Sequence, residues 1–252
     1  MPSSNVPSAC LIVIGNEVLS GRTRDANLQY LGHGLNEVGI HMTEARVIAD
    51  DEATIIATVN ACRAAFDYVF TTGGIGPTHD DITSACIAKA FGLPLIRDPR
   101  AIEIMSRHYE TPEDFTEARK KMTEMPEGAE LILNPVSSAP GYRVENVYVM
   151  AGVPRIMQAM FDGIRHTLSG GAPMVSRTII AYVPEGILAE PLGAVQDAHS
   201  SCEIGSYPFN RAGKFGASLV VRSRDAAAVD VAIGAVRSMV RDLGATPEEE
   251  TA

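Results

Sequence analysis

Short apolar runs alternate with longer amphipathic segments along the first two-thirds of the chain. Residues 9–15 and 68–71 are short and largely apolar, which is typical of buried strands. From residue 25 to residue 38, large apolar side chains recur at helical spacing until Gly39 ends the pattern. The same reasoning predicts strands at 40–49, 130–134 and 147–151, and helices at 55–66, 81–91 and 154–168, with two more helices in the polar region 97–126.

This order of elements predicts an α/β protein with a doubly wound, mostly parallel sheet. Right-handed crossovers place helices on both faces of such a sheet, so three layers are expected. Ligands of such sheets bind beyond the carboxyl ends of the strands. We therefore expect residues 8–170 to form one domain with its site at that edge.

The pattern changes after a stretch of small residues at 169–173, the best candidate for a linker. Beyond it, an alternating strand at 178–183 precedes a helix at 188–199 and an amphipathic helix at 226–243. Residues 203–207 and 217–223 are expected to pair as a hairpin across a loop at 208–216. These elements predict a small C-terminal α+β, ferredoxin-like unit at 175–245, followed by a frayed acidic tail at 247–252.

Composition narrows the classes of function. The 252 residues carry a formal net charge of −10, which argues against a general nucleic-acid binder and against attachment to an anionic membrane surface. The chain start does not resemble a signal peptide, and no apolar run is long enough to span a membrane. The four cysteines form no C-x-x-C pair, so free thiols in a reducing compartment, the cytoplasm, are expected.

A glycine loop between a predicted strand and helix is the most informative segment. Gly73, Gly74 and Gly76 permit positive φ angles and a close approach of the backbone. Exposed N–H groups there, with the Thr72 and Thr78 hydroxyls and a helix N-terminus, favour a phosphate. The loop lacks the third glycine of the dinucleotide fingerprint and the Gly-Lys-Ser/Thr of a P-loop. The alternative is a plain connector in which Asp80 or Asp81 caps the helix.

Carboxylates follow the predicted strands at the same sheet edge. Asp80 and Asp81, beside the phosphate loop, are suited to holding a Mg²⁺-type ion between them. Asp50, with its neighbour Asp51, closes another strand, although capping of the next helix explains these residues equally well. Glu17 flanks the first strand–helix connection. Nearby Asp25 and Asn27 offer further groups for a hydrogen bond to a ribose or a pterin-like ring.

A loop of small residues at 134–141 is a further candidate for ligand contact. It contains two hydroxyls, at Ser137 and Ser138, and ends in Pro140-Gly141. Such a loop either packs against a ligand or only makes the turn that its composition favours. The sequence leaves both interpretations open.

In combination, these motifs resemble the MoaB/Mog molybdopterin-binding family. The similarity is strongest to the CinA-like branch (competence/damage-inducible protein A) and the related N-terminal domain of eukaryotic FAD synthetase. It covers residues 8–170. The blocks that carry it are Ile14-Gly-Asn-Glu-Val-Leu-Ser-Gly21, Asp25-Ala-Asn27, Asp50-Asp51, Thr72-Gly-Gly-Ile-Gly-Pro-Thr78, Asp80-Asp-Ile-Thr83, Asn134-Pro135, Ala139-Pro-Gly141 and Gly152-Val-Pro154.

The resemblance implies a three-layer MoaB/Mog-like fold that holds a pterin or an adenine nucleotide through its phosphates. Mog-like members adenylylate molybdopterin with Mg-ATP, in molybdenum cofactor biosynthesis. CinA-like members are similar to divalent-metal pyrophosphatases acting on ADP-ribose or FAD. A third possibility is a protein that binds such a ligand without turning it over. No deamidase domain of the kind found in full-length CinA follows in the sequence, so amide hydrolysis of nicotinamide nucleotides is not expected.

The resemblance also implies roles for individual residues. Gly73, Gly74, Gly76 and Thr78 would carry phosphate, and Ser137, Ser138, Gly141 and Glu17 would line the ligand. Asp50 and Asp81 would be catalytic, and together with Asp80 would hold a divalent metal (Mg, Co or Ni). Molybdopterin is a possible ligand, and a homodimer or homotrimer is expected. Ser137-Ser138 stands where many CinA proteins have Gly-Thr, and Met150-Ala151-Gly152 where they have Leu-Pro-Gly, so the resemblance does not fix the substrate.

Overall fold

The computed structural model describes residues 6–211 and 213–250, and the chain divides after Gly171 into two compact units. The elements of the first unit are β1 (Ser8–Ile14), α1 (Asn16–Leu19), α2 (Asn27–Glu37), β2 (His41–Ile48), α3 (Glu52–Ala65), β3 (Tyr68–Thr72), α4 (Thr83–Phe91), β4 (Leu95–Arg97), α5 (Pro99–Ser106), η1 (Pro112–Asp114), α6 (Glu117–Lys121), β5 (Glu124–Pro126), β6 (Glu130–Ile132), β7 (Gly141–Val144), β8 (Val147–Met150), α7 (Pro154–Ile164) and η2 (Arg165–Thr167).

The central sheet of the first unit has the strand order β2-β1-β3-β8-β7-β6. Strands β2, β1, β3 and β8 are parallel, whereas β7 and β6 run antiparallel to their neighbours. The chain leaves β1 for β2 on one side and returns to β3 on the other, so the direction of winding reverses between β1 and β3. A crevice opens beyond the carboxyl ends of the strands at such a switch point.

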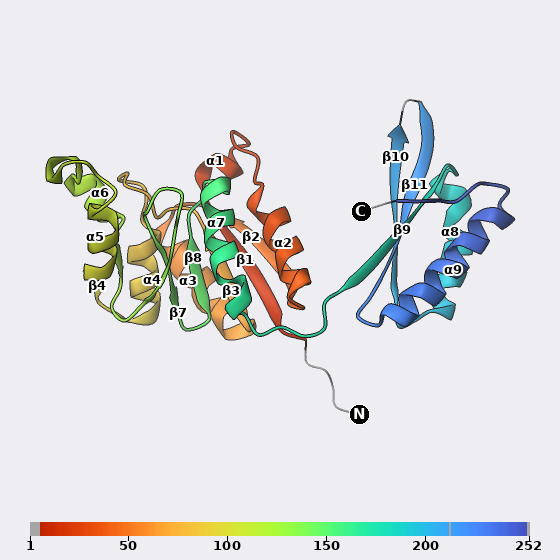
Figure 1. Ribbon diagram of the computed structural model, residues 1–252, viewed down its shortest axis with the longest axis horizontal. Coiled ribbons are helices and arrows are strands. Elements are labelled where there is room, and N and C mark those ends of the chain that lie inside the picture. Colours follow the sequence, from red (N-terminus) through yellow and green to blue (C-terminus); the bar gives the residue numbers. More distant parts are fainter. Residues whose placement is uncertain (1–5, 212, 251–252) are drawn as a thin grey trace. The chain divides into compact units, whose positions relative to one another are not determined.

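Helices cover both faces of this sheet (Figure 1). On one face, Ile12 of β1 packs with Val59 of α3 and Ile87 of α4. On the other face, Leu11 packs with Leu35 of α2, Phe161 of α7 and their neighbours. Because β1 is buried on both faces, it has to be a continuous apolar run rather than an alternating one. The predicted doubly wound fold is confirmed.

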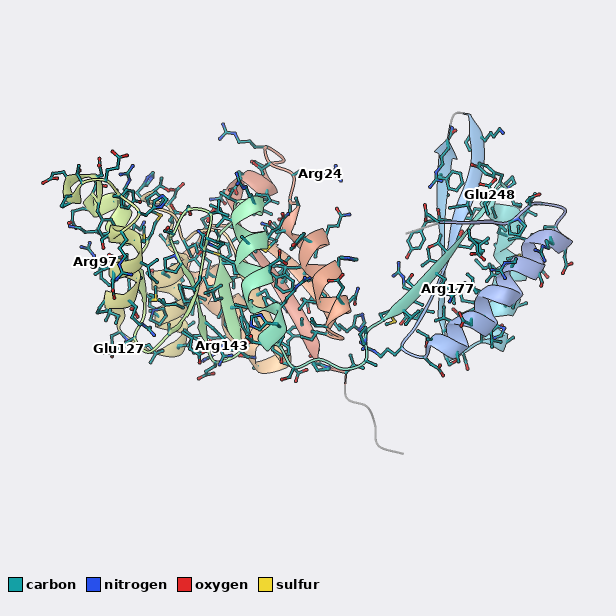
Figure 2. The ribbon with its side chains drawn as sticks, viewed as in Figure 1. Arg24, Arg97, Glu127, Arg143, Arg177 and Glu248 are labelled. Carbon is teal, nitrogen blue, oxygen red and sulfur yellow. The ribbon has the colours of Figure 1, made fainter. Side chains whose placement is uncertain are left out.

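Three short strands of the first unit were not predicted. β7 completes the antiparallel part of the sheet, and β4 and β5 form a separate two-stranded ribbon beside α5 and α6. Arg97 of β4 (Figure 2) makes ion pairs with Glu117 and Glu124 at 2.8 and 3.2 Å. Strands of three or four residues leave no periodicity that a sequence window can detect.

The second unit contains β9 (Val175–Ala181), α8 (Glu185–Ala198), β10 (Glu203–Arg211), β11 (Lys214–Ser223), α9 (Ala226–Asp242) and β12 (Glu248–Glu249). Its antiparallel sheet has the order β10-β11-β9-β12, and α8 and α9 lie on one face (Figure 1). In chain order this is β-α-β-β-α-β, the ferredoxin-like pattern, of which the first five elements were predicted. Ile179, Leu219, Ile233 and their neighbours form its core.

Two details of the second unit differ from expectation. The predicted loop at 208–216 is mostly strand, because β10 is an edge strand and tolerates Pro208 there. The predicted frayed tail instead contributes β12, which pairs with β9 as far as residue 249; residues 251 and 252 lie outside the described part.

All four cysteines are buried and free, as predicted. Over the described ranges, no helix combines the length and the apolar character needed to cross a membrane.

Candidate functional site

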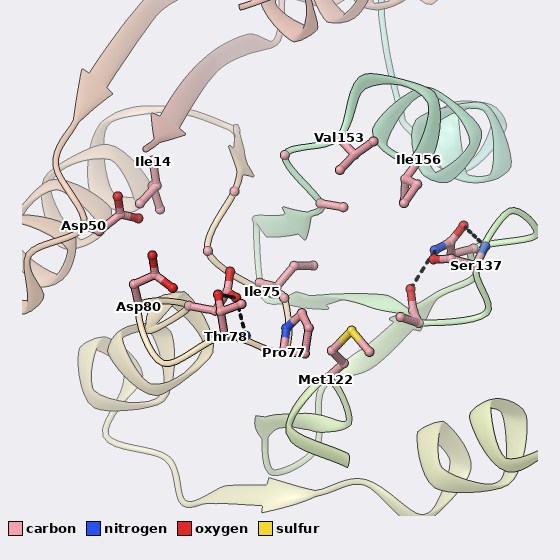
Figure 3. Close-up of a pocket in the computed structure, with 18 of the residues that line it drawn as sticks. Ile14, Asp50, Ile75, Pro77, Thr78, Asp80, Met122, Ser137, Val153 and Ile156 are labelled. Atoms are coloured by element: carbon pink, nitrogen blue, oxygen red, sulfur yellow. Dashed lines mark hydrogen bonds between the residues drawn. The ribbon is translucent and has the colours of Figure 1, made fainter. Parts of the chain in front are cut away.

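A pocket of about 490 Å³ lies beyond the carboxyl ends of the central strands (Figure 3). It is lined by the segments that follow β1, β2, β3 and β8, which are far apart in sequence. The doubly wound topology brings these segments to one edge. The pocket therefore lies where the sequence predicted a ligand.

The glycine loop forms one wall, and its backbone conformation requires glycine. Gly73 has φ +104°, and a Cβ there would lie 2.1 Å from the carbonyl oxygen of Ile14. Gly74 has φ +68°, and a Cβ would lie 2.1 Å from Thr83 Oγ1. Thr83 Oγ1 in turn donates to the Gly73 carbonyl at 3.0 Å. The first turn of α4 thus fixes the loop close to the end of β1.

Asp81 braces the loop rather than capping α4. Its Oδ2 accepts from the Thr78 backbone N–H at 2.8 Å and from the Thr78 hydroxyl. A Cβ on Gly76 would lie 2.7 Å from the same oxygen. The N-cap of α4 is Ile82, which makes no capping bond through its side chain. The alternative that Asp80 or Asp81 caps this helix is therefore wrong, and Asp81 shapes the turn that presents Thr78 to the pocket.

Asp80 is exposed at the pocket rim and is held in its charged form. The pKa of Asp80 lies below its ordinary value because the nearby Thr78 hydroxyl, its own backbone N–H and the charges of His79 and Lys121 favour the carboxylate. Lys121 Nζ donates to the Thr78 carbonyl. Sequence reasoning gave Lys121 no role, because only the tertiary fold brings the end of α6 to the glycine loop.

Asp50 and Asp51 have different roles. Asp51 is the N-cap of α3, where its carboxylate accepts from Thr54 N and Oγ1 at 2.9 and 2.7 Å. These two bonds lower the pKa of Asp51. Asp50 lines the pocket instead, and its Oδ2 accepts from the Asn16 N–H at 2.8 Å. The capping alternative thus explains Asp51 but not Asp50.

The loop at 134–141 is organised by Asn134. Asn134 Nδ2 donates to Ser137 Oγ at 2.7 Å and to the Ala139 carbonyl at 2.9 Å. Its Oδ1 accepts from the N–H groups of Val136 and Ser137. These bonds hold Ser137 at the pocket wall, which Glu17 also lines.

Two residues expected to contact the ligand do not line the pocket. Ser138 has φ +61°, and its hydroxyl lies 3.2 Å from His108 Nδ1. Gly141 is buried at the start of β7, where a Cβ would lie 2.4 Å from the Val149 carbonyl oxygen. The position of Gly141 is explained by the close approach of two strands.

One side of the pocket is apolar, which sequence reasoning missed. Ile75, Met122, Val153 and Ile156 line it, and they come from three separate segments of the chain (Figure 3). Ile75 and Val153 belong to sequence blocks that carry the family resemblance, but no local motif links the three segments, so no pattern in the sequence would have grouped these residues. Apolar walls beside a few fixed polar groups suit a flat ring.

The carboxylates offer only oxygen ligands for a cation. Within residues 6–211 and 213–250, no group of three or more His, Cys, Asp or Glu side chains is arranged to hold a metal ion. Asp50 and Asp80 lie on the same side of the pocket (Figure 3), whereas Asp81 is engaged with Thr78. Mg²⁺-type ions bind one or two carboxylates and complete their shell with water and substrate phosphates. The donors present fit such a partial site.

A glycine loop and carboxylates at the switch point of a doubly wound sheet are typical of α/β proteins that bind phosphorylated small molecules. The chain belongs to the molybdopterin-binding domain family, since the family model described as "Probable molybdopterin binding domain" matches residues 10–169. A second model, "FAD synthase, middle domain", matches residues 173–249.

Relatives agree with the predicted CinA-like branch. A CinA-like protein of Desulfosudis oleivorans is 34% identical to this chain, and the matched part covers 71% of this chain and 46% of that protein. A probable FAD synthase of Caenorhabditis briggsae is 28% identical over 96% of this chain and 50% of its own length. The crystal structure of CinA from Thermoplasma acidophilum, described as of unknown function, matches 65% of this chain and 99% of its own, with 33% identity and a TM-score of 0.61.

Proposed function

We propose that this chain binds a phosphorylated pterin or adenine nucleotide in the pocket and hydrolyses the diphosphate of an ADP-ribose- or FAD-type molecule with a divalent ion. One observation supports this most: a single pocket joins the glycine loop, the Asp50 and Asp80 carboxylates and an apolar wall. The similarity to a probable FAD synthase and to a FAD synthase middle domain supports a nucleotide, and the family description supports a pterin.

Each part of the pocket has a distinct task in this proposal. Backbone N–H groups of the loop from Gly74 to Gly76 bind the diphosphate, because those of Gly73 and Thr78 are already paired, and Asp81 keeps that loop in shape. Asp50 and Asp80 would hold a Mg²⁺, Co²⁺ or Ni²⁺ ion. When bound, such an ion offsets phosphate charge and lowers the pKa of a bound water. The wall around Met122 and Ile156 receives the ring and keeps water away from it.

The test is release of AMP from ADP-ribose or FAD by the purified protein with each of the three metals. We expect turnover with at least one metal and none in chelator. Absence of AMP with every metal and both substrates would rule out the pyrophosphatase. Tight binding of the same compounds by calorimetry without product would then identify a non-catalytic binder.

Molybdopterin adenylyl transfer is the second candidate, because the matched family is described as molybdopterin-binding. Incubation with molybdopterin and Mg-ATP separates it from hydrolysis. Adenylylated molybdopterin with release of pyrophosphate would identify a transferase. AMP from ADP-ribose would identify the hydrolase.

Self-association into a dimer or trimer is part of this proposal. The eight-residue strand β2 lies at an edge of the central sheet, where one side of its backbone faces no other strand of that sheet. Native mass spectrometry distinguishes a monomer from either assembly.

A further inference from the structure

Two buried polar atoms close to the pocket have no hydrogen-bond partner within the described residues. They are Oγ1 of Thr72, at the end of β3, and Oδ1 of Asn27, at the start of α2. The residues are only 1% and 3% exposed. A buried polar atom left unpaired costs free energy, so native proteins rarely keep one without a reason. Two such atoms beside one ligand pocket suggest that a group from outside the chain pairs with them.

Both residues line a second, smaller chamber of about 40 Å³. This chamber lies beside the main pocket and shares several walls with it, including Ile14, Glu17 and Gly152. A space of this size is large enough for a water molecule or for a small polar group of a ligand. The chamber is thus an annex of the main pocket.

Asn27 is fixed in position by its other end. Its Nδ2 donates to the Gly152 carbonyl at 2.9 Å. This bond fixes the orientation of the Asn27 amide, because a flipped amide would lose the bond. The atom that remains unpaired is therefore the oxygen Oδ1, which accepts a hydrogen bond. The Thr72 hydroxyl can donate or accept. Neither residue belongs to the glycine loop or to the acidic side of the pocket.

The remaining polar groups of the chamber decide what it accepts. The charged residues that line it together with Asn27 are Glu17, Asp25 and Arg24. Asp25 already accepts from the Leu28 N–H at 2.9 Å. An anion would meet two carboxylates against one guanidinium, and that guanidinium belongs to an exposed side chain, so a phosphate is disfavoured. A neutral or cationic hydrogen-bond donor is favoured.

We infer that this chamber, the Thr72–Asn27 subsite, receives a hydrogen-bond-donating group of the ligand whose phosphates lie on the glycine loop. The donor is a sugar hydroxyl or a ring amino group. The inference rests on the proposed function, because it takes the phosphates to lie on the loop that follows β3. It assigns recognition of the non-phosphate part of the ligand to residues outside that loop.

Thr72→Val tests the subsite because it removes the hydroxyl and keeps the shape of the side chain. The hydroxyl has no partner in the described chain, so the melting temperature should stay equal or rise. The affinity for ADP with Mg²⁺, measured by calorimetry, should fall about five- to tenfold. Thr72→Ser should restore most of that affinity. A merely structural role would not produce this combination.

Thr71→Val is the matched control. Thr71 is the preceding residue of the same strand, is completely buried and also has an unpartnered hydroxyl within the described residues. Its side chain points to the opposite face of the sheet, away from the chamber. The same substitution there should leave the affinity for ADP unchanged.

Different probes identify the donor and separate this inference from the proposed function. Pyrophosphate should bind the unaltered protein and Thr72→Val equally well. If a ribose hydroxyl occupies the chamber, 2′-deoxy-ADP or 3′-deoxy-ADP should bind the unaltered protein about as weakly as ADP binds Thr72→Val. The substitution should then not weaken the binding of that deoxy compound any further. If a ring amino group occupies it, hydroxymethylpterin diphosphate should be the probe that the substitution weakens.

Two results would overturn the inference and leave the proposed function intact. One is equal binding of all nucleotide and pterin probes by Thr72→Val and the unaltered protein. The other is a lower melting temperature with unchanged affinity, which would mean that Thr72 pairs with a structural water. Failure of pyrophosphate, ADP and the pterin diphosphate to bind the unaltered protein would instead overturn the proposed function, and the inference with it.

Discussion

Adjacent residues of one type differ in role at the end of β2. Asp51 caps α3 and Asp50 lines the pocket. Asp50→Asn keeps the acceptor for the Asn16 N–H but removes a negative charge, so metal-dependent turnover should fall about 100-fold with little change in stability. Asp51→Ala should lower the melting temperature by about 3 °C and leave KM unchanged. Measurements of AMP release and of the melting temperature of both variants test these two predictions. Equal losses of turnover in the two variants would contradict the assignment of different roles to Asp50 and Asp51.

Lys121 gives a second contrast at the scale of single residues. Its ammonium reaches the Thr78 carbonyl and is close to where the diphosphate would bind. Lys121→Met should weaken pyrophosphate binding about fivefold, and the difference should shrink in 1 M salt. Lys120→Met is the control, since Lys120 pairs with Glu117 at 2.8 Å on the surface. Similar losses in both variants would indicate a general charge effect instead.

The sequence located the polar half of the site but not the apolar half. Gly73, Asp50 and Thr78 follow strands, and topology alone brings strand ends together. Met122 reaches the pocket, and Lys121 reaches the Thr78 carbonyl, only through the packing of α6, which no motif encodes. Asp81 was identified as a site residue, but its bonds to Thr78 depend on loop geometry that residue types do not reveal.

At the scale of an element, α2 contains two glycines in contrasting environments. A Cβ on Gly34 would lie 2.4 Å from Phe161 Cε1 of α7, whereas a Cβ on Gly32 would meet no atom within 4 Å. Gly32→Ala should raise the free energy of unfolding by about 0.5–1 kcal/mol through helix propensity. Gly34→Ala should lower it by about 1–3 kcal/mol through overpacking. Urea unfolding of both variants measures this; stabilisation by Gly34→Ala would show that α2 and α7 separate easily.

Helix α5 links stability to pH through its N-cap. Asp98 accepts from Arg100 N at 2.8 Å and forms a 2.6 Å ion pair with the Arg100 guanidinium. These contacts hold the pKa of Asp98 below its ordinary 3.8, since Arg100 stabilises the charged form. A carboxyl with a lowered pKa in the folded state contributes stability above 3.8, and this contribution is lost as pH falls through the folded-state value.

Asp98→Asn tests this linkage. Asparagine still caps a helix but does not titrate, so the variant should be less stable at pH 7. The difference in melting temperature from the unaltered protein should narrow as pH falls from 5 to 2. Parallel melting curves at every pH would show that Asp98 does not contribute.

Long elements were predicted better than short ones. Apolar residues recur at helical spacing in α3 and α9, and they form continuous runs in the strands of the parallel core. Burial of these elements requires such patterns, so the sequence shows them. β4, β5 and β7 are short and depend on neighbours distant in sequence. The extension of β10 through Pro208 was missed because a proline is acceptable there only at a sheet edge, and the sequence does not mark which strand is the edge.

At the scale of the whole molecule, each of the two units has its own buried core. One lies around β1, and the other lies between the second sheet and α8 and α9. All residues that line the main pocket belong to the first unit. The Gly171 N–H donates to the Gly39 carbonyl at 3.0 Å, so a fragment that ends at Gly171 keeps this contact.

We therefore expect residues 1–171 and 172–252 to fold separately, because a unit with its own core can do so. Each fragment should show a cooperative thermal transition by circular dichroism. The first fragment should bind pyrophosphate with the affinity of the full chain, because every residue that lines the pocket is retained, and the second should not bind it. If the first fragment melts cooperatively but binds more than about tenfold weaker, ligand binding depends on the second unit in a way that the pocket residues do not explain.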